Sequence, residues 1–272
     1  MGHLFRLLNT GGHDGFFNMG MDEALLEAVS RGDSPPVLRF YQWQPPAVSV
    51  GYFQGLTEEV DSEACKRFGV DLVRRISGGG AVFHHAELTY SIIMPLGHPL
   101  AGETILESYQ ILCPGLVEGL RLFGIPAQFV PINDIHTGDR KISGNAQTRR
   151  MGCVLQHGTV LLDLDADLMF ELLKVPAEKT KGKIIREVKE RVTSLRAVLG
   201  REISFEEAVP VFTEGFRRSL SLEFPLPPGS KTGGSPESAS PPEPDRPTEA
   251  EETRARTLAA EKFASPRWLY KR

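Results

Sequence analysis

A run of three glycines between arginines and a histidine is the segment of this chain best suited to chemistry. It spans Arg74–His84 and reads RRISGGGAVFH, with a strand-like run on each side. Glycine backbone can approach a phosphate or adenylate closely and direct N–H groups at it, while arginine binds its charge. The GK[ST] ending of a P-loop and the GxGxxG dinucleotide spacing are both missing. The alternative is a tight glycine hairpin with solvated arginines.

A second polar segment places a lysine inside a strand-like stretch. Asn133 and Asp134 precede it, and Lys141, Ser143 and Gly144 belong to the run RKISGNAQ. A cation beside a small-residue turn suits the negative charge that develops on a carboxyl or phosphate oxygen during acyl transfer. Lys141 on an edge strand that points to solvent is the alternative. Asn133 and Asp134 suit a metal-bound phosphate, with Asp134 contacting Mg²⁺ through it, or else an Asx turn.

A third segment, QHGTVLLD, brings His157 and Gly158 into an apolar strand. A histidine before glycine is typical of close backbone approach, and equally of a hydrogen-bonded core histidine. Cys153 lies between Lys141 and His157, so it is a candidate nucleophile if a neighbouring histidine or Arg150 lowers its pKa. We favour a packing role for it at the start of a buried strand, because cysteine is among the most buried residue types.

The predicted strands and helices that carry these residues do not alternate regularly along the chain. Strand-like runs that follow one another without regular helical crossovers, together with clustered helices, favour an α+β sheet over a doubly wound parallel one. The expected strands are 36–42, 47–53, 71–76, 88–94, 141–147 and 154–163, and the expected helices are 18–30, 61–68, 103–123 and 204–220.

The composition divides the chain into a body and a tail. Residues 227–247 are rich in Pro, Gly, Ser and Glu and predict a flexible linker between a catalytic domain over 1–226 and a tail over 248–272. Thr248 and Glu251 have capping-box spacing, so the tail is expected to begin as a helix and to dock on the body through its aromatic residues.

The bulk numbers limit the classes of partner. A net charge of −4 gives no overall basic field for nucleic acid or anionic lipid. Three widely spaced cysteines without CxxC spacing indicate reduced thiols. Residues 1–17 have no hydrophobic core of signal-peptide length and no later run approaches a membrane span, so we expect a cytoplasmic protein that acts on neither nucleic acid nor membrane.

In combination and order, these segments resemble the biotin/lipoate A/B protein ligase family. RRISGGGAVFH resembles its RRxxGGGAV loop, INDI with DRKISGNAQ resembles its NDI and KISGxAQ segment, and QHGTVLLD resembles its HGT strand. FNMGMDEALL and VSVGYFQ also fit, so the resemblance covers most of the chain outside the linker. It implies a central mixed or antiparallel sheet flanked by helices, as in class II synthetase-like catalytic domains.

The resemblance also implies roles for the site residues. Arg75, Ser77, Gly78 and Gly79 with the run Gly80, Ala81, Val82 and Phe83 would form the acyl-adenylate loop. Lys141 would contact the acyl carbonyl and the phosphate, and Asn133, Asp134, Ser143, Gly144, His157 and Gly158 would complete the site. The acyl tail would need an apolar slot, which Val82 and Ile142 are expected to line.

Two chemistries share this scaffold. A lipoate-protein ligase uses ATP and Mg²⁺ to activate lipoate as lipoyl-AMP and transfers it to a lysine of a lipoyl carrier domain or H-like protein. An octanoyltransferase moves octanoyl from acyl carrier protein through an enzyme cysteine. Residues 85–91 and GYFQ are closer to the transferases, but the NDI segment is ligase-like and no cysteine lies between Phe123 and Lys141. We therefore expect the ligase, with a separate accessory protein for adenylation, and retain the transferase and a non-catalytic carrier-binding protein as alternatives.

Overall fold

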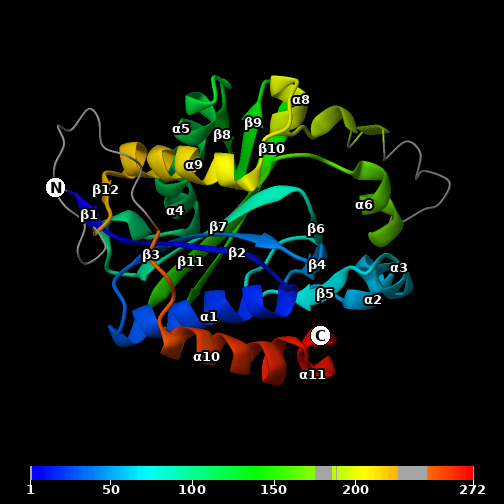
Figure 1. The fold of residues 1–272 in the computed structure, drawn as a ribbon, viewed down its shortest axis with the longest axis horizontal. Coiled ribbons are helices and arrows are strands. Elements are labelled where there is room, and N and C mark those ends of the chain that lie inside the picture. The colour runs from blue at the N-terminus through cyan, green and yellow to red at the C-terminus, as the bar shows by residue number, and fades with distance from the viewer. Residues whose placement is uncertain (1, 175–185, 188, 226–243, 272) are drawn as a thin grey trace.

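A seven-stranded mixed sheet forms the centre of the protein (Figure 1). The structure is a computed structural model that describes residues 2–174, 186–187, 189–225 and 244–271. Its strand order is β2 (Arg6–His13), β3 (Val37–Trp43), β7 (Glu87–Pro95), β11 (Cys153–Leu161), β10 (Arg140–Arg150), β9 (Asp134–Thr137) and β8 (Gln128–Val130). β2 runs parallel to β3, and all other neighbours are antiparallel. The predicted α+β class with a mixed central sheet is confirmed.

A smaller sheet lies beside one end of the large one. Its order is β5 (Asp71–Arg74), β4 (Ala47–Val50) and β6 (Val82–His84), with β4 parallel to β5 and antiparallel to β6. Its apolar residues Val48, Val50 and Phe83 pack with α2 (Leu56–Glu59), α3 (Ser62–Phe68) and α6 (Ala166–Leu172). A two-stranded sheet pairs β1 (His3–Leu4), near the N-terminus, with β12 (Leu222–Glu223), which follows α9 (Phe205–Leu220) in the sequence.

Helices cover both faces of the large sheet, as Figure 1 shows. On one face lie α4 (Ile105–Leu112), α5 (Pro114–Leu122), α8 (Leu195–Leu199), α9 (Phe205–Leu220) and the short 3₁₀ turn Pro99–Ala101. On the other lie α1 (Gly15–Arg31) and α10 (Glu249–Leu258), followed by the π-helical turn Ala259–Phe263 and α11 (Pro266–Leu269). Alternate residues of β7 serve the two faces, because Ile92 packs toward α9 and Ile93 toward α1.

The helix predicted over 103–123 is wrong as a single element. It is two helices that meet at Cys113 and Pro114, with Pro114 at the first position of α5. Proline has no N–H to donate to the carbonyl one turn earlier, so the hydrogen-bond ladder stops and a new helix begins there.

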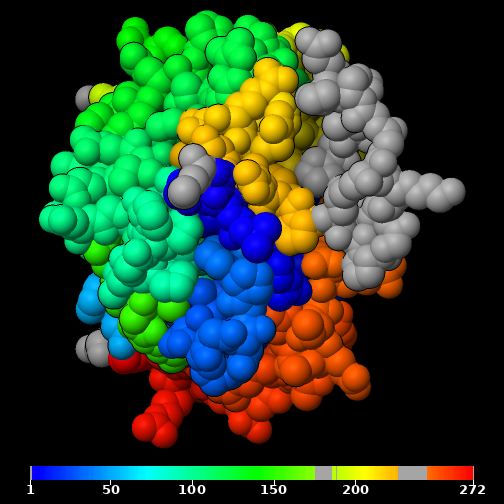
Figure 2. Space-filling view, turned by 90° about the vertical axis from the view of Figure 1, so that its left-hand side faces the viewer, coloured from blue at the N-terminus to red at the C-terminus, as the bar shows by residue number. Residues whose placement is uncertain are grey.

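The tail packs on α1, and Figure 2 shows its orange and red residues against the blue N-terminal part of the chain. Thr248 and Glu251 form the predicted capping box. Arg254 and Lys262 pair with Glu27 and Glu23 of α1, and Trp268 donates its indole N–H to the carbonyl of Arg74 at 2.8 Å. Most of the predicted linker, residues 227–243, lies outside the described residues. No helix in the described ranges has the length and apolar character needed to span a membrane.

Candidate functional site

A cavity of about 340 Å³ lies between the small sheet, strands β10 and β11 of the large sheet, and α6. This volume lies within the usual range of small-molecule sites, roughly 300–1,000 Å³. Its apolar wall is formed by Met19, Ala81, Val82, Phe83, Leu161, Leu164, Met169, Leu173 and Val192. Polar side chains also line it, namely Ser49, Arg75, His84, Asn133, Lys141, Ser143, Asn145 and His157. The cavity can therefore hold an apolar chain whose head group meets polar atoms.

The glycine loop forms one rim of the cavity, and Arg75 holds it in shape. Arg75 donates to the carbonyls of Gly78 and Gly80 at 2.8 and 2.7 Å and to the carbonyl and hydroxyl of Ser49 at 3.1 and 3.0 Å. Burial lowers the pKa of Arg75 to about 10, so the guanidinium stays charged at neutral pH. The sequence suggested that such arginines bind a ligand charge directly. Here the Arg75 guanidinium hydrogen-bonds to the backbone of the loop and stabilises its conformation.

Close backbone approach explains one glycine beside this loop. A Cβ on Gly51 would collide with the carbonyl oxygen of Gly79, which itself has φ of +96°. Both positions therefore favour glycine. Arg74 donates to the carbonyls of Gly51, Gln54 and Leu269, so it ties the neighbouring loop to the C-terminal tail.

Lys141 of β10 lines the same cavity as the glycine loop. Its ammonium pairs with Asp134 at 2.7 Å, and its side chain is 39% exposed. Gly144 leaves room beside this ammonium, because a Cβ there would collide with it. Gly79 and Lys141 thus line the same cavity.

Strand alternation corrects one expectation about the acyl slot. Lys141 and Ser143 line the cavity. Ile142 is fully buried on the opposite face of the sheet, in the core that includes residues of α5 and α9. Successive side chains of a strand point to opposite faces. Val82 lines the slot as expected, and Ile142 does not.

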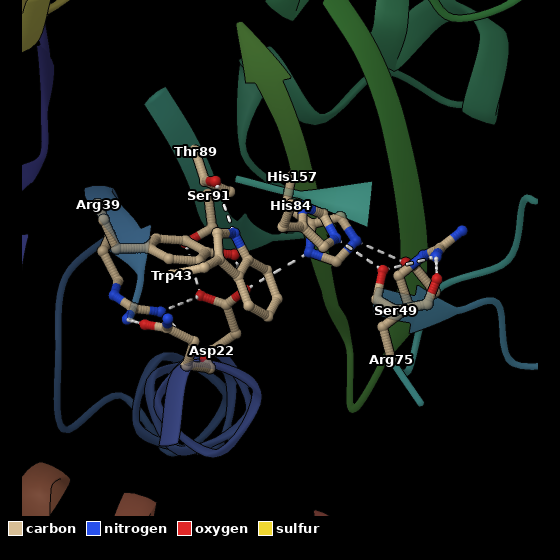
Figure 3. A network of polar contacts seen from close by, with 12 residues as sticks. Asp22, Arg39, Trp43, Ser49, Arg75, His84, Thr89, Ser91 and His157 are labelled. Atoms are coloured by element: carbon tan, nitrogen blue, oxygen red, sulfur yellow. Dashed lines mark hydrogen bonds and ion pairs between the residues drawn. The ribbon is translucent and has the colours of Figure 1, made fainter. Parts of the chain in front are cut away.

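Two serine–histidine–carboxylate chains meet this cavity, and Figure 3 labels their residues Ser49, His84, His157 and Asp22. In the first, which we call the Ser49 relay, the Ser49 hydroxyl lies 2.7 Å from Nε2 of His84, and Nδ1 of His84 lies 2.7 Å from Glu87. In the second, the Ser77 relay, Ser77 lies 2.6 Å from Nε2 of His157, whose Nδ1 faces Asp22 at 3.5 Å. Both histidines line the cavity. Of the two serines only Ser49 does.

Asp22 of α1 anchors the Ser77 relay from beneath. It accepts from Arg39 at 2.7 Å, from Tyr41 at 3.1 Å and from Ser91 at 2.8 Å. Burial by itself would raise the pKa of Asp22, but Arg39 and the donor groups outweigh it and the pKa is lowered. Burial lowers the pKa of His157, although Asp22 opposes this shift. At neutral pH, His157 is therefore a neutral imidazole against a buried carboxylate.

All three cysteines of the chain are described, and each is buried and outside the cavity lining. Burial raises the pKa of Cys65 to about 11 and of Cys113 to about 12. Cys153, the first residue of β11, lies in the core between the sheet and α1, and burial raises its pKa as well. Nucleophilic cysteines need a lowered pKa and access. The structure therefore gives no support to Cys153 as the nucleophile.

The structure brings most of the predicted site residues together. Lining the cavity are Arg75, Gly79, Gly80, Ala81, Val82, Phe83, Asn133, Lys141, Ser143, Gly144, His157 and Gly158. Ser77, Gly78 and Asp134 lie one contact away, through His157, Arg75 and Lys141 respectively. Among the described residues, no group of three or more His, Cys, Asp or Glu is placed to hold a metal.

Sequence reasoning missed Ser49, Trp43 and the role of His84. Trp43 stacks on the His84 ring with centroids 4.0 Å apart and donates its N–H to Thr89, which in turn donates to Glu87. His84 was visible at the end of the glycine motif, but its partner Ser49 comes from β4, 35 residues earlier. Their meeting depends on the pairing of β4 with β6, which no local pattern specifies.

Comparison with known proteins identifies similar chains. A family model described as the lipoyl protein ligase A/B catalytic domain matches residues 14–217. The octanoyltransferase LipM of Geobacillus kaustophilus is 36% identical over 99% of both chains, and that of Anoxybacillus flavithermus is 38% identical over 81% of this chain and 88% of its own. The solved bi-partite lipoate protein ligase of Thermoplasma acidophilum is 31% identical, with a TM-score of 0.81 over 99% of this chain and 96% of that one.

These relatives correct the expected activity. Octanoyltransferases at 32% to 38% identity overturn the expectation of an ATP-dependent lipoate-protein ligase, and with it ATP and Mg²⁺ as cofactors. The ligase-like NDI segment misled the interpretation. Asp134, expected to reach Mg²⁺ through a phosphate, is instead the ion-pair partner of Lys141.

Proposed function

Because the chain belongs to the family of lipoyl protein ligase A/B catalytic domains, we propose that it transfers an octanoyl group from a thioester donor to a lysine of a lipoyl carrier domain. Octanoyltransferases among its relatives support the reaction type. A thioester is already activated, so the transfer needs no nucleotide.

The cavity carries this proposal, because it combines an apolar wall with a cation. Val82, Leu161 and Met169 provide surface for a medium acyl chain, and Lys141 contributes a cation to the same lining. An acyl carbonyl seated near Lys141 would have its developing negative charge stabilised by the ammonium. Asp134 would fix the position of that ammonium through their 2.7 Å ion pair.

The polar lining would also orient the acyl head group. Asn145 is held on both sides, since its carbonyl oxygen accepts from Tyr90 at 2.8 Å and its amide donates to the Asn133 carbonyl at 2.9 Å. The buried Ser143 hydroxyl has no hydrogen-bond partner within the protein. It is therefore free to donate to an acyl carbonyl, which would also satisfy a buried polar group.

The carrier partner is a lipoyl domain or an H-like protein in this proposal. The accessory protein was expected for adenylation, and transfer from a thioester contains no adenylation step. We therefore propose that this chain acts alone on donor and carrier. Transfer by the purified chain, without a second polypeptide, tests this point.

A donor assay tests the proposed function. The purified chain is mixed with a lipoyl carrier domain and octanoyl-acyl carrier protein without ATP, and the carrier is weighed by mass spectrometry. We expect the carrier to gain one octanoyl group. Lys141→Ala should reduce the rate by about 10²-fold or more, as loss of an oxyanion-stabilising group does. The exposed Lys66→Ala, 74% exposed on α3, is the matched control and should leave the rate unchanged. A carrier that stays unmodified would refute the proposal.

A further inference from the structure

We propose that Ser49 is the nucleophile of this site and carries the octanoyl group as an ester between the donor and the carrier lysine. This inference rests on the proposed octanoyl transfer. It starts from a mismatch between that chemistry and the chain: acyl transfer through an enzyme thiol needs a reactive cysteine, and all three cysteines lie outside the cavity with raised pKa values. A hydroxyl activated by a histidine can serve in place of the thiol.

The Ser49 relay has the geometry of an activated serine. Glu87 is a carboxylate acceptor 2.7 Å from Nδ1 of His84, so Nδ1 carries the ring proton and Nε2 is free to accept. The Ser49 hydroxyl lies 2.7 Å from that Nε2 and donates to it. A nucleophile bonded to a base, and a base oriented by an acid, are the relations that define a catalytic triad on any fold.

The surroundings hold His84 rigidly in this orientation. Trp43 stacks on the ring at 4.0 Å with an interplanar angle of 13°. Thr89 accepts from Trp43 at 2.9 Å and donates to Glu87 at 2.8 Å, which fixes the carboxylate. The ring therefore keeps both nitrogens aligned between Glu87 and Ser49.

Arg75 places a positive charge beside the Ser49 hydroxyl. Its guanidinium donates to the Ser49 hydroxyl oxygen at 3.0 Å. That contact stabilises negative charge on the oxygen whenever the hydroxyl gives up its proton or leaves from the ester. The same arginine braces the glycine loop, so the position of the nucleophile and the shape of the loop are coupled.

The other hydroxyls near the cavity meet fewer of these conditions. Ser77 has a histidine and an acid, but it does not line the cavity, and its histidine faces Asp22 at 3.5 Å. Ser143 lines the cavity but has no base within hydrogen-bond reach. Ser49 combines access to the cavity with a complete relay.

Two balanced steps follow from this arrangement. In the first, the Ser49 oxygen attacks the thioester carbonyl while its proton passes to Nε2 of His84; the ester C–O bond forms, the C–S bond breaks, and the leaving thiolate takes the proton from His84. In the second, the neutral amine of the carrier lysine attacks the ester carbonyl; the amide C–N bond forms, the C–O bond breaks, and the amine proton returns through His84 to the Ser49 oxygen.

Burial protects the intermediate that this route requires. Ser49 is fully closed to bulk water and His84 is 5% exposed, although both line the cavity. Water would hydrolyse an exposed ester and waste the acyl group, so exclusion of water favours transfer to the lysine. The acyl chain itself would seal the cavity from within.

A trapping experiment tests the inference. The full chain is incubated with octanoyl-acyl carrier protein, the donor of the transfer assay, without the lipoyl carrier domain, quenched in acid, and mapped by peptide mass spectrometry. We expect one octanoyl group on the peptide that contains Ser49, and parallel double-reciprocal lines in steady-state assays with both substrates, as for a ping-pong mechanism. Ser49→Ala should lose the adduct and at least about 10³-fold in transfer rate. Ser49→Cys, which keeps a nucleophile, should still be acylated, now as a thioester cleaved by neutral hydroxylamine.

The outcomes separate this inference from the proposed function. If wild type transfers octanoyl, and either no adduct forms on the Ser49 peptide or Ser49→Ala keeps a rate within about threefold of wild type, the serine nucleophile is refuted and octanoyl transfer stands. If wild type transfers no octanoyl from any thioester, the proposed function itself fails. A circular dichroism spectrum and a urea midpoint of Ser49→Ala equal to those of wild type separate loss of the nucleophile from loss of the fold.

Discussion

Replacement of Asp22 by asparagine should destabilise the protein far more than the loss of a surface charge. Asp22 is 2% exposed and accepts three hydrogen bonds, from Arg39, Tyr41 and Ser91. Asparagine keeps the shape but removes the charge and turns one acceptor into a donor. The Arg39 guanidinium, which is fully buried, would then lack its counter-ion.

The magnitude follows from this burial. Removing one partner of a buried ion pair costs about 3–5 kcal/mol, because the remaining charge stays desolvated. For a chain of this size that loss lowers Tm by about 6–20 °C. The Asn18 side chain still accepts from Arg39 at 2.7 Å, which places the expected cost near the lower end of this range.

Urea unfolding followed by circular dichroism measures this cost. Asp163→Asn is the matched control, because its pair with Arg196 at 2.8 Å is 44% and 52% exposed and should contribute only about 0–1 kcal/mol. The double variant Asp22→Asn with Arg39→Gln should recover part of the lost free energy of unfolding, since it removes the unpaired charge. If Asp22→Asn lowers the free energy of unfolding no more than Asp163→Asn does, the buried Asp22–Arg39 pair does not stabilise the fold in this way.

Three further predictions concern the site. Gly51→Ala should lower kcat/KM for transfer by about 10²-fold, because its Cβ would displace the glycine loop at Gly79. Gly97→Ala, with open space at its Cβ, is the control and should leave kcat/KM unchanged. Equal kcat/KM values for the two variants would contradict the close approach of Gly51 and Gly79. The free energy of unfolding should fall as pH drops below about 6.5, because the pKa of His157 is lowered in the folded state and the unfolded chain then binds the extra proton. His157→Gln should flatten this pH dependence in urea unfolding, and an unchanged slope would show that another group causes it. Cys153→Ala should keep transfer within about threefold of wild type, and a loss of the size expected for a nucleophile would return Cys153 to the mechanism.

The parts of the site that are local in sequence could be predicted. Glycines with adjacent arginines, and a lysine in a strand, are visible in short windows, and their family resemblance placed Gly79 and Lys141 in one site. The break at Pro114 was also readable, because proline at that position ends a hydrogen-bond ladder, and the longer helical periodicity obscured it.

The contact between Ser49 and His84 depended on information that short windows lack. The Ser49–His84 contact requires β4 to pair with β6 in one register, with Ser49 opposite Val82 and Ala47 opposite His84. Ile142 was assigned to the wrong face, although strand alternation with the predicted site residues Lys141 and Ser143 places its side chain on the opposite face. The activity was misassigned for a different reason. The segment before Lys141 has no cysteine and resembles a ligase, whereas curated relatives that match nearly the whole chain are octanoyltransferases.

A competition between acyl donors distinguishes octanoyl transfer from ATP-dependent lipoate ligation in one reaction. Purified chain and lipoyl carrier domain receive octanoyl-acyl carrier protein together with lipoate, ATP and Mg²⁺ at equal donor concentrations, and the mass of the carrier reports which group was attached. We predict that nearly all modified carrier bears octanoyl and that omission of ATP changes nothing. A carrier that bears lipoyl, and loses it when ATP is omitted, would contradict the account.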